Sequence, residues 1–263
     1  MSLCIEQRGN PDAQPLVLLH GWGMSGAIWE SWLPVLEQDF HVLVVDLPGL
    51  GRSTFDTDQP YTLDTLTDLI LQQLASRLTQ PAIWLGWSLG GVVAAHIAQR
   101  YPERAAALIT ISTNPCFVQR ADWPEAMPRA TFDAFQRSLE QNPVKTLNRF
   151  AMLQVQGDPE ARNLLRTLKG IIAESSATPR LAESLALLAE DYRPLFAGLK
   201  VPRLFLFAAN DALVPAAVGV QSLVKKDAQL IDSAGHVAFI TAEQAVTQAV
   251  VGWIQGQDSG ANP

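Results

Sequence analysis

The sequence predicts an α/β fold in which a mostly parallel central sheet carries helices on both faces. Apolar runs of strand length alternate with longer segments of helical periodicity, which is the rhythm of parallel sheets. The apolar run at residues 82–85 leads into Gly86-Trp87-Ser88-Leu89-Gly90, and a helix-like run follows at once. From about residue 114 to 192 the rhythm breaks, which predicts an all-helical insertion between two strands.

Length and composition favour a soluble enzyme-sized globule. The chain has 263 residues, 48% hydrophobic and 17% charged, enough for one large α/β domain or two small ones. No apolar run approaches the ~18 residues of a membrane span. The first residues lack a basic segment followed by an apolar stretch, so no signal peptide is expected and cytoplasm is the default localisation. The net charge of −7 argues against nucleic acid as a partner.

No cofactor is predicted. The two cysteines, Cys4 and Cys116, form neither a metal-binding spacing nor a disulfide framework. No cluster of carboxylates and histidines suggests a metal, and no G-x-G-x-x-G pattern follows a strand. We therefore expect cofactor-free chemistry, and a monomer is the default assembly.

The remaining elements follow in order along the chain. Strands are predicted at residues 3–9, 16–19, 41–46, 82–87 and 107–112, from residue 201 up to Asp211, and at 228–231. Helices are predicted at residues 27–36, 63–78, 214–224 and 243–254, and directly after Ser88. The polar tail at residues 255–263 is expected to fray.

The insertion predicts a lid. Its helical patterns are separated by prolines, namely Pro124, Pro128, Pro143, Pro159 and Pro179. An insertion of this kind would lie over the carboxyl ends of the strands, where ligands bind in such sheets. The predicted domains are thus a core of residues 1–113 and 193–263 and a helical lid of residues 114–192.

The glycine-flanked serine is typical of a nucleophile elbow, a sharp turn between a strand and a helix. The strand and helix pass close together there, so side chains at Gly86 and Gly90 would clash. The turn lifts the Ser88 hydroxyl clear of the sheet. It also leaves the Leu89 N–H at the positive end of a helix dipole, where it suits a developing oxyanion.

Ser88, Asp211 and His236 each follow a predicted strand, so parallel strands bring them to one edge of the sheet. An imidazole activates a serine hydroxyl by taking its proton, and a carboxylate fixes the ring's tautomer. The other histidines fit less well: His41 opens a strand, His96 is mid-helix, and His20 lies in an early loop. For the acid, Asp227 and Asp232 flank the last strand. The alternative role for Asp211 is as the N-cap of the 214–224 helix.

The early loop His20-Gly21-Trp22-Gly23 follows the second strand and resembles the oxyanion loop of the α/β-hydrolase superfamily. This resemblance assigns the second oxyanion donor to the backbone N–H of Trp22, opposite that of Leu89. His20 is expected to support the loop through hydrogen bonds. The turn from Asp46 to Ser53 also looks like this superfamily, with Asp46 and Arg52 in structural roles.

The whole chain resembles one branch of that superfamily, the pimeloyl-[acyl-carrier protein] methyl ester esterases of biotin synthesis. Two superfamily-level motifs and two more specific ones carry the resemblance: residues 20–23 and 86–91, then residues 114–117 with 122–124, and the run 149–154. The resemblance implies an α/β-hydrolase fold and hydrolysis of a methyl ester on a pimeloyl chain carried by acyl carrier protein. It places the acyl chain against Trp22, Ser88, Leu89, His236 and the segment Phe150, Ala151, Met152, Leu153, Gln154.

The charge of the insertion also favours an acidic carrier protein as partner. Residues 141–170 contain five basic and two acidic residues in a chain that is acidic overall. Lys145 and Arg149, and likewise Arg162 and Arg166, are four residues apart, so each pair shares a helix face. The resemblance assigns these four positions to binding an acidic carrier protein, although Lys145 stands where an arginine is expected. A merely solvated helix face is the alternative.

Other function classes must be weighed beside this one. A broad short-chain carboxylesterase or lactonase with no carrier-protein partner keeps the same triad. A non-catalytic binding protein on the same fold is disfavoured by the intact serine, acid and histidine. Haloalkane dehalogenases are excluded, because they carry aspartate at the Ser88 position, whereas C–C hydrolases and perhydrolases are only disfavoured by the insertion motifs. The preferred chain length is left open.

Overall fold

The computed structural model describes residues 1–175 and 180–260, and its centre is a seven-stranded sheet of order β1-β3-β2-β4-β5-β6-β7. All pairs are parallel except β1 with β3, which is antiparallel. The strands are β1 Ile5–Arg8, β2 Pro15–Leu19, β3 His41–Val45, β4 Ala82–Trp87, β5 Ala105–Ile111, β6 Arg203–Ala208 and β7 Ala228–Ile231. Each predicted strand is present, and the predicted fold class is confirmed.

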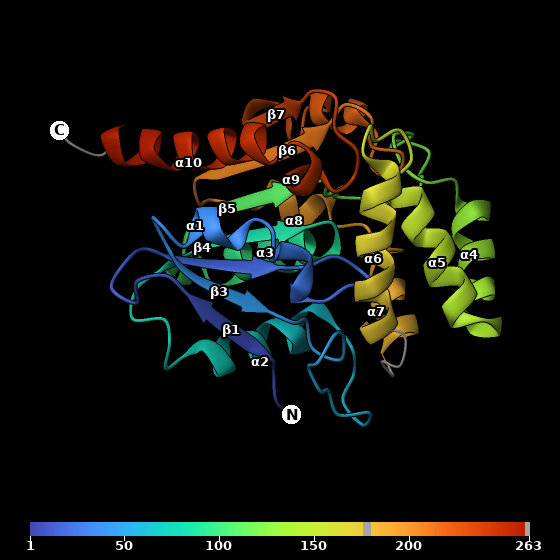
Figure 1. The fold of residues 1–263 in the computed structure, drawn as a ribbon, viewed down its shortest axis with the longest axis horizontal. Coiled ribbons are helices and arrows are strands. Elements are labelled where there is room, and N and C mark those ends of the chain that lie inside the picture. Colours follow the sequence, from blue (N-terminus) through green and yellow to red (C-terminus); the bar gives the residue numbers. More distant parts are fainter. Residues whose placement is uncertain (176–179, 261–263) are drawn as a thin grey trace.

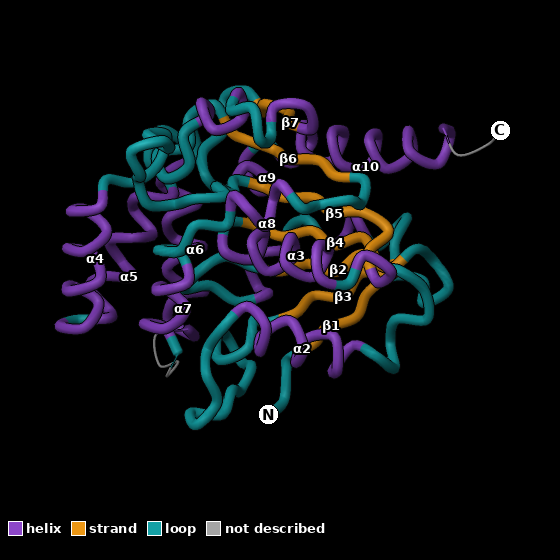
Figure 2. Tube along the Cα trace, turned by 180° about the vertical axis from the view of Figure 1, so that it is seen from behind, coloured by secondary structure: helices purple, strands orange, loops and turns teal. Residues whose placement is uncertain are grey.

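Helices cover both faces of this sheet. Figure 1 shows α1 (Leu33–Leu36), α9 (Ala238–Thr241) and α10 (Glu243–Gly260) on the near face. Seen from behind in Figure 2, α2 (Leu63–Leu74), α3 (Leu89–Arg100) and α8 (Arg193–Ala197) cover the other face. Since β2, β3 and β4 are buried along their whole length, their apolar runs need cover on both sides.

Between β5 and α8 the chain forms α4 (Arg129–Gln141), α5 (Pro143–Gln154), α6 (Ala161–Ser175) and α7 (Leu181–Leu187). These helices stand together at the carboxyl ends of the parallel strands (Figure 1). No strand occurs in this segment within the described residues, only isolated bridges. Pro179, one of the expected punctuation points, lies outside the described residues.

Pro143 separates two helices of the insertion, as expected. Pro143 occupies the first turn of α5, where its missing N–H costs nothing. The Asn142 side chain caps the same helix, accepting a hydrogen bond from the Lys145 N–H at 3.0 Å. Asn142 and Pro143 therefore end α4 and start α5 with a single residue between the two helices.

Two predicted helices are shorter than expected. The 27–36 helix is split into a 3₁₀ turn, Gly26–Trp29, and α1. Pro34 explains the break, because it has no N–H for the carbonyl of residue 30. The 63–78 helix ends at Leu74. Its last turn tightens, as both Arg77 and Leu78 donate to the Leu74 carbonyl.

The predicted helix at residues 214–224 is also corrected. The 214–224 segment is not an α-helix but the 3₁₀ turn Ala216–Val220. Gly219 lies so close to the Phe207 ring that an added Cβ would sit 2.9 Å from it, so packing on β6 shapes this segment. Further 3₁₀ turns are Pro102–Arg104 and Lys225–Asp227.

The last helix continues through the expected frayed tail to Gly260, and residues 261–263 lie outside the described range. Among the described residues, no helix is long and apolar enough to span a bilayer.

Candidate active site

Ser88 forms the turn between β4 and α3. Its φ of 55° and ψ of −118° lie in a region that side chains other than glycine rarely adopt. Such strain persists only where the surroundings fix it, and it is common at functional sites. The predicted elbow is therefore present in its expected context of strand, turn and helix.

The flanking glycines are required by close backbone contacts. A Cβ on Gly86 would lie 2.2 Å from the Gly90 carbonyl oxygen, and a Cβ on Gly90 would lie 2.1 Å from the Leu19 carbonyl oxygen. A Cβ on Gly91 would lie 2.0 Å from Thr113 Oγ1. The clash expected at Gly86 and Gly90 is confirmed, and Gly91 adds a third contact that fixes the start of α3.

Asp211 and His236 meet at the carboxyl edge of the sheet. The Asp211 Oδ2 atom lies 2.8 Å from Nδ1 of His236, and both side chains are buried. With Asp211 ionised, Nδ1–H is the donor, which leaves Nε2 as an acceptor. The other carboxylate oxygen accepts from the N–H groups of Leu213 and Val214, at 2.8 and 2.9 Å. Asp211 thus caps the following turn and contacts His236 at once.

The free nitrogen of His236 is buried and makes no hydrogen bond with any described residue, Ser88 included. Contacts between a nucleophile and its base are often long before substrate binds. The backbone oxygen of His236 accepts from the Trp87 indole N–H at 2.8 Å, so the residue before Ser88 also anchors the histidine.

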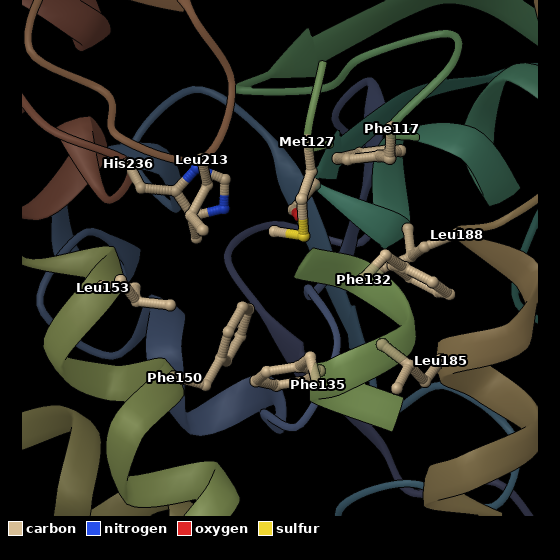
Figure 3. A pocket seen from close by; sticks show the side chains of 11 residues that line it. Phe117, Met127, Phe132, Phe135, Phe150, Leu153, Leu185, Leu188, Leu213 and His236 are labelled. Atoms are coloured by element: carbon tan, nitrogen blue, oxygen red, sulfur yellow. The ribbon is translucent and has the colours of Figure 1, made fainter. Parts of the chain in front are cut away.

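Ser88 and His236 line one cavity between the core and the helical insertion. Figure 3 shows its wall of aromatic and aliphatic side chains, with the His236 imidazole at one edge. The other lining residues are Phe117, Met127, Phe132, Phe135, Phe150, Leu153, Leu185, Leu188 and Leu213. None of these nine side chains carries a charge.

The segment 150–154, expected to contact substrate, is divided by the structure. Phe150 and Leu153 line the cavity beside Ser88 and His236. Ala151 is buried but does not line it, and Met152 is 51% exposed. Gln154 is fully buried, and neither polar atom of its side chain has a hydrogen-bond partner within the described residues.

Trp22 and Leu89 are buried beside the cavity without lining it. The Trp22 ring packs edge-on against Phe150 and Phe135, with centroids 5.0 and 5.5 Å apart. Its indole N–H donates to the Leu181 carbonyl at 2.9 Å, which ties the ring to the insertion. The Trp22 ring therefore supports the cavity wall from behind.

The backbone around the two expected oxyanion donors is favourably placed. Leu89 is the first residue of α3, so its N–H has no acceptor within the helix. A Cβ on Gly21, the residue before Trp22, would lie 3.2 Å from Ser88 Cβ. The loop thus passes directly beside the serine.

His20 holds that loop in place. Its Nδ1 lies 2.8 Å from the Gly21 carbonyl oxygen, and its Nε2 accepts the Leu47 N–H at 2.9 Å. Burial lowers the pKa of His20, only partly offset by Asp46. A neutral ring that makes both hydrogen bonds matches the supporting role expected from the sequence.

The rival residues lie elsewhere. His96 is 2.8 Å from Thr67 Oγ1, with its pKa lowered mainly by burial. His41 contacts Gln7, and Asp227 pairs with Arg203 at 2.7 Å. Among the described residues, no group of three His, Cys, Asp or Glu side chains could hold a metal ion.

The four basic residues assigned to carrier binding are all exposed. Lys145 and Arg149 lie on α5, and Arg162 and Arg166 lie on α6. Helices α5 and α6 pack against each other. The two pairs therefore stand on neighbouring helices next to the cavity.

Sequence reasoning missed most of the cavity wall. Phe117 belongs to a motif that carried the family resemblance, but nothing assigned it to the cavity. Phe132, Phe135, Leu185 and Leu188 recur at helical spacing on α4 and around α7, which is a signal for a buried face but not for its partner.

Comparisons with known proteins agree on the family. The α/beta hydrolase fold family model matches residues 14–243. The pimeloyl-[acyl-carrier protein] methyl ester esterase of Pectobacterium atrosepticum is 38% identical, over 95% of this chain and 96% of that protein. The protein of the same name from Chromobacterium violaceum is 34% identical, over 98% of this chain and all of that protein.

A solved structure confirms the fold. The bromoperoxidase from Bacillus anthracis superposes with a TM-score of 0.86 at 23% identity, covering 96% of this chain and 95% of that one. The matched family model and the relatives, which align over nearly the whole chain, place it clearly: it belongs to the α/β-hydrolase family and, within it, to the pimeloyl-[acyl-carrier protein] methyl ester esterases.

Proposed function

We propose that this chain is a serine carboxylesterase that hydrolyses the methyl ester of pimeloyl-[acyl-carrier protein], releasing methanol and the free carboxyl needed for biotin synthesis. The observation that carries the proposal is the buried pair of Asp211 and His236 beside Ser88 at an apolar cavity. The names of the relatives supply the substrate. The enzyme acts as a monomer in the cytoplasm.

The roles follow from the geometry. The Ser88 hydroxyl attacks the ester carbonyl while Nε2 of His236 takes its proton, and Asp211 holds the ring in the required tautomer. The backbone N–H groups of Leu89 and Trp22 stabilise the oxyanion. His236 then protonates the departing methoxide, and water attack on the acyl-enzyme, assisted by the same imidazole, releases the acid.

The cavity supports a neutral acyl chain as substrate. Its wall is aromatic and aliphatic apart from Ser88 and His236, so it favours methylene groups and places no lysine or arginine beside a carboxylate. A terminal carboxyl masked as its methyl ester fits such a site. The free carboxylate product is disfavoured there, which favours its departure.

Residues 114–192 act as a lid that also docks the carrier. Of the eleven described residues that line the cavity, eight come from this segment, and Ser88 is only 4% exposed, so substrate entry requires the helices to move. The exposed pairs Lys145/Arg149 and Arg162/Arg166 then attract the acidic carrier protein by electrostatic steering.

The decisive test is a paired assay on the purified protein. One substrate is pimeloyl methyl ester on acyl carrier protein, and the other is a free short-chain p-nitrophenyl ester, each measured as kcat/KM. We expect a large preference for the carrier-bound ester. Comparable rates, or a preference for the free ester, would support a broad short-chain esterase instead. The Ser88→Ala variant should remain folded and lose turnover of both esters.

Charge reversal tests the docking face separately. Changing Arg149, Arg162 and Arg166 to Glu should lower kcat/KM for the carrier-bound ester and spare the free ester, increasingly so at low ionic strength. Lys226→Glu is the control for a single reversal, measured beside Arg149→Glu alone, because Lys226 is exposed but lies outside the insertion. Equal losses from the control and the reversed variants would refute the docking face.

A further inference from the structure

The connection between α5 and α6 touches the loop that carries His236. Asp158, in that connection, is only 6% exposed. Its Oδ2 accepts a hydrogen bond from the Gly235 N–H at 3.2 Å and another from the Thr241 hydroxyl at 2.7 Å. Gly235 immediately precedes His236, and Thr241 ends α9, the short helix that follows it.

We propose that Asp158 is a positioning residue for His236, acting from the helical insertion through the backbone of the histidine loop. The inference rests on the proposed role of His236 as the general base. Asp158 does not line the cavity and touches none of the reacting groups; it fixes the peptide next to the imidazole.

A second contact of the same connection supports this role. Gly157 has a φ of +83°, and a Cβ there would lie 3.0 Å from the Asn210 carbonyl oxygen. Asn210 precedes Asp211 and donates its N–H to the Ala234 carbonyl at 2.9 Å. The turn at 157–158 therefore rests against both loops of the acid–histidine pair.

The histidine loop is held from two sides. From the sheet, the Trp87 indole binds the His236 carbonyl at 2.8 Å. From the insertion, Asp158 binds the peptide N–H one residue earlier. The loop contains Ser233 at a φ of 57°, a conformation that a side chain adopts only when its surroundings impose it. Losing either anchor lets the imidazole shift relative to Ser88.

A local role for Asp158 explains the hydrogen bond of only one of its two carboxylate oxygens. Oδ1 accepts the Glu160 N–H at 2.8 Å, which organises the start of α6. Oδ2 is used entirely by residues 77 and 83 positions away. A turn-forming role would not require these long-range bonds, and a buried carboxylate accepting them joins the insertion to the core.

The arrangement also links the docking face to the active site. Arg162 lies four residues after Asp158, in the first turns of α6. A carrier protein that contacts Arg162 therefore holds the segment that holds His236. The two residues nevertheless differ in what they control, since Asp158 acts on every ester and Arg162 acts only on carrier-bound ones.

The test compares Asp158→Asn, Thr241→Val and Thr241→Ser in the full chain. If the asparagine oxygen stays on the Glu160 N–H, its NH₂ group replaces Oδ2 and faces two donors, the Gly235 N–H and the Thr241 hydroxyl. The hydroxyl can rotate to accept from the NH₂ group, so the Gly235 N–H is the group left unpaired. Active sites are counted by titration with a fluorophosphonate, and kcat and KM for both esters are expressed per active site. The rate of fluorophosphonate labelling and the midpoint of thermal unfolding are measured as well. Glu160→Gln, an exposed neighbouring acid, is the control.

We expect Asp158→Asn to lower kcat roughly 10- to 100-fold for both esters, with KM nearly unchanged. The rate of fluorophosphonate labelling should fall by a similar factor. Thr241→Val should have a smaller effect, which Thr241→Ser restores. The losses in the double variant Asp158→Asn/Thr241→Val should be less than additive, because the two residues share a hydrogen bond. Glu160→Gln should resemble wild type.

An unchanged kcat per titrated site, with only the thermal midpoint lowered, would overturn the inference and leave Asp158 a structural residue. Because labelling needs no particular ester, the inference survives even if the carrier-bound substrate is wrong. A wild-type protein that is not labelled at Ser88 would refute the proposed catalytic site, and the positioning role with it.

Discussion

The indole of Trp87 donates a hydrogen bond to the backbone oxygen of His236 across 149 residues of sequence, at 2.8 Å. Their rings also lie 5.3 Å apart, and Phe239 packs edge-on against the indole at 5.5 Å. The residue that leads into the nucleophile elbow therefore fixes the loop of the histidine. Strand β4 thus positions both Ser88 and His236, between which the proposed mechanism transfers a proton.

Replacing Trp87 with Phe should lower both stability and turnover. The buried His236 carbonyl loses its donor, which costs about 2 kcal/mol in the free energy of unfolding. Turnover per titrated site should fall roughly tenfold, because the loop loses an anchor. Trp84→Phe is the control: Trp84 lies on the same strand and donates to the Arg104 carbonyl at 3.1 Å. It should lose stability without losing kcat, and equal kcat losses in the two variants would contradict the anchoring role.

The elbow should tolerate no side chain at Gly90. A methyl group there meets the Leu19 carbonyl oxygen at 2.1 Å, so Gly90→Ala must push α3 away from β2. We expect a loss of about 3 kcal/mol or more, seen as a lower urea midpoint or a poor soluble yield. Gly252→Ala, on the exposed side of α10 with nothing near the added Cβ, should instead stabilise the protein by up to about 1 kcal/mol. A Gly90→Ala midpoint close to that of wild type would show that the turn relaxes.

Local sequence is enough to predict the strands of the sheet and the order in which Ser88, Asp211 and His236 follow them. The strands are continuous apolar runs, because a parallel sheet is buried on both faces, and Ser88, Asp211 and His236 each follow a strand end. The helix at 214–224 failed because packing of Gly219 on Phe207 decides its backbone. Periodicity reports that a face is buried but not how tightly the chain is held there.

The cavity wall and Asp158 could not be derived in this way. Phe135 and Leu185 come from helices whose relative rotation is set by tertiary packing, and the partners of Asp158 lie 77 and 83 residues away. The family motif at 149–154 includes Phe150 and Leu153, which line the cavity. It could not tell that the adjacent Met152 faces solvent, since helix phase separates neighbours by about 100°.

The neighbouring residues Met152 and Leu153 of α5 face opposite environments, so their alanine variants can be compared directly. Leu153→Ala removes apolar contact from the cavity and should reduce kcat/KM for the ester by up to roughly tenfold. Met152→Ala truncates a larger but 51% exposed side chain and should leave kcat/KM within about twofold of wild type. Steady-state kinetics on the free p-nitrophenyl ester separates this effect from carrier docking. A larger loss from Met152→Ala than from Leu153→Ala would mean that substrate runs along the outer face of α5.

The buried His20 should make stability fall as the solution is acidified. Its imidazole binds a proton less readily in the folded protein than in the unfolded chain, because burial lowers its pKa below the ordinary value of 6.5. Between these two pKa values the unfolded state carries more protons. The free energy of unfolding therefore decreases as pH falls from about 6.5 towards the folded pKa, and is independent of this group at higher pH.

Urea denaturation at pH 7.5, 6.5 and 5.5 measures this slope, and His20→Gln isolates the contribution of the ring. Glutamine does not titrate, and its side-chain oxygen can still accept the Leu47 N–H that Nε2 of His20 accepts. The variant should be less stable at pH 7.5 but lose less stability on acidification. His96→Gln should flatten the slope less, because His96 is partly exposed and Asp64 opposes the lowering of its pKa. If the wild type and His20→Gln lose stability in parallel, then His20 is protonated as easily in the folded protein as in the unfolded chain, and another group drives acid unfolding.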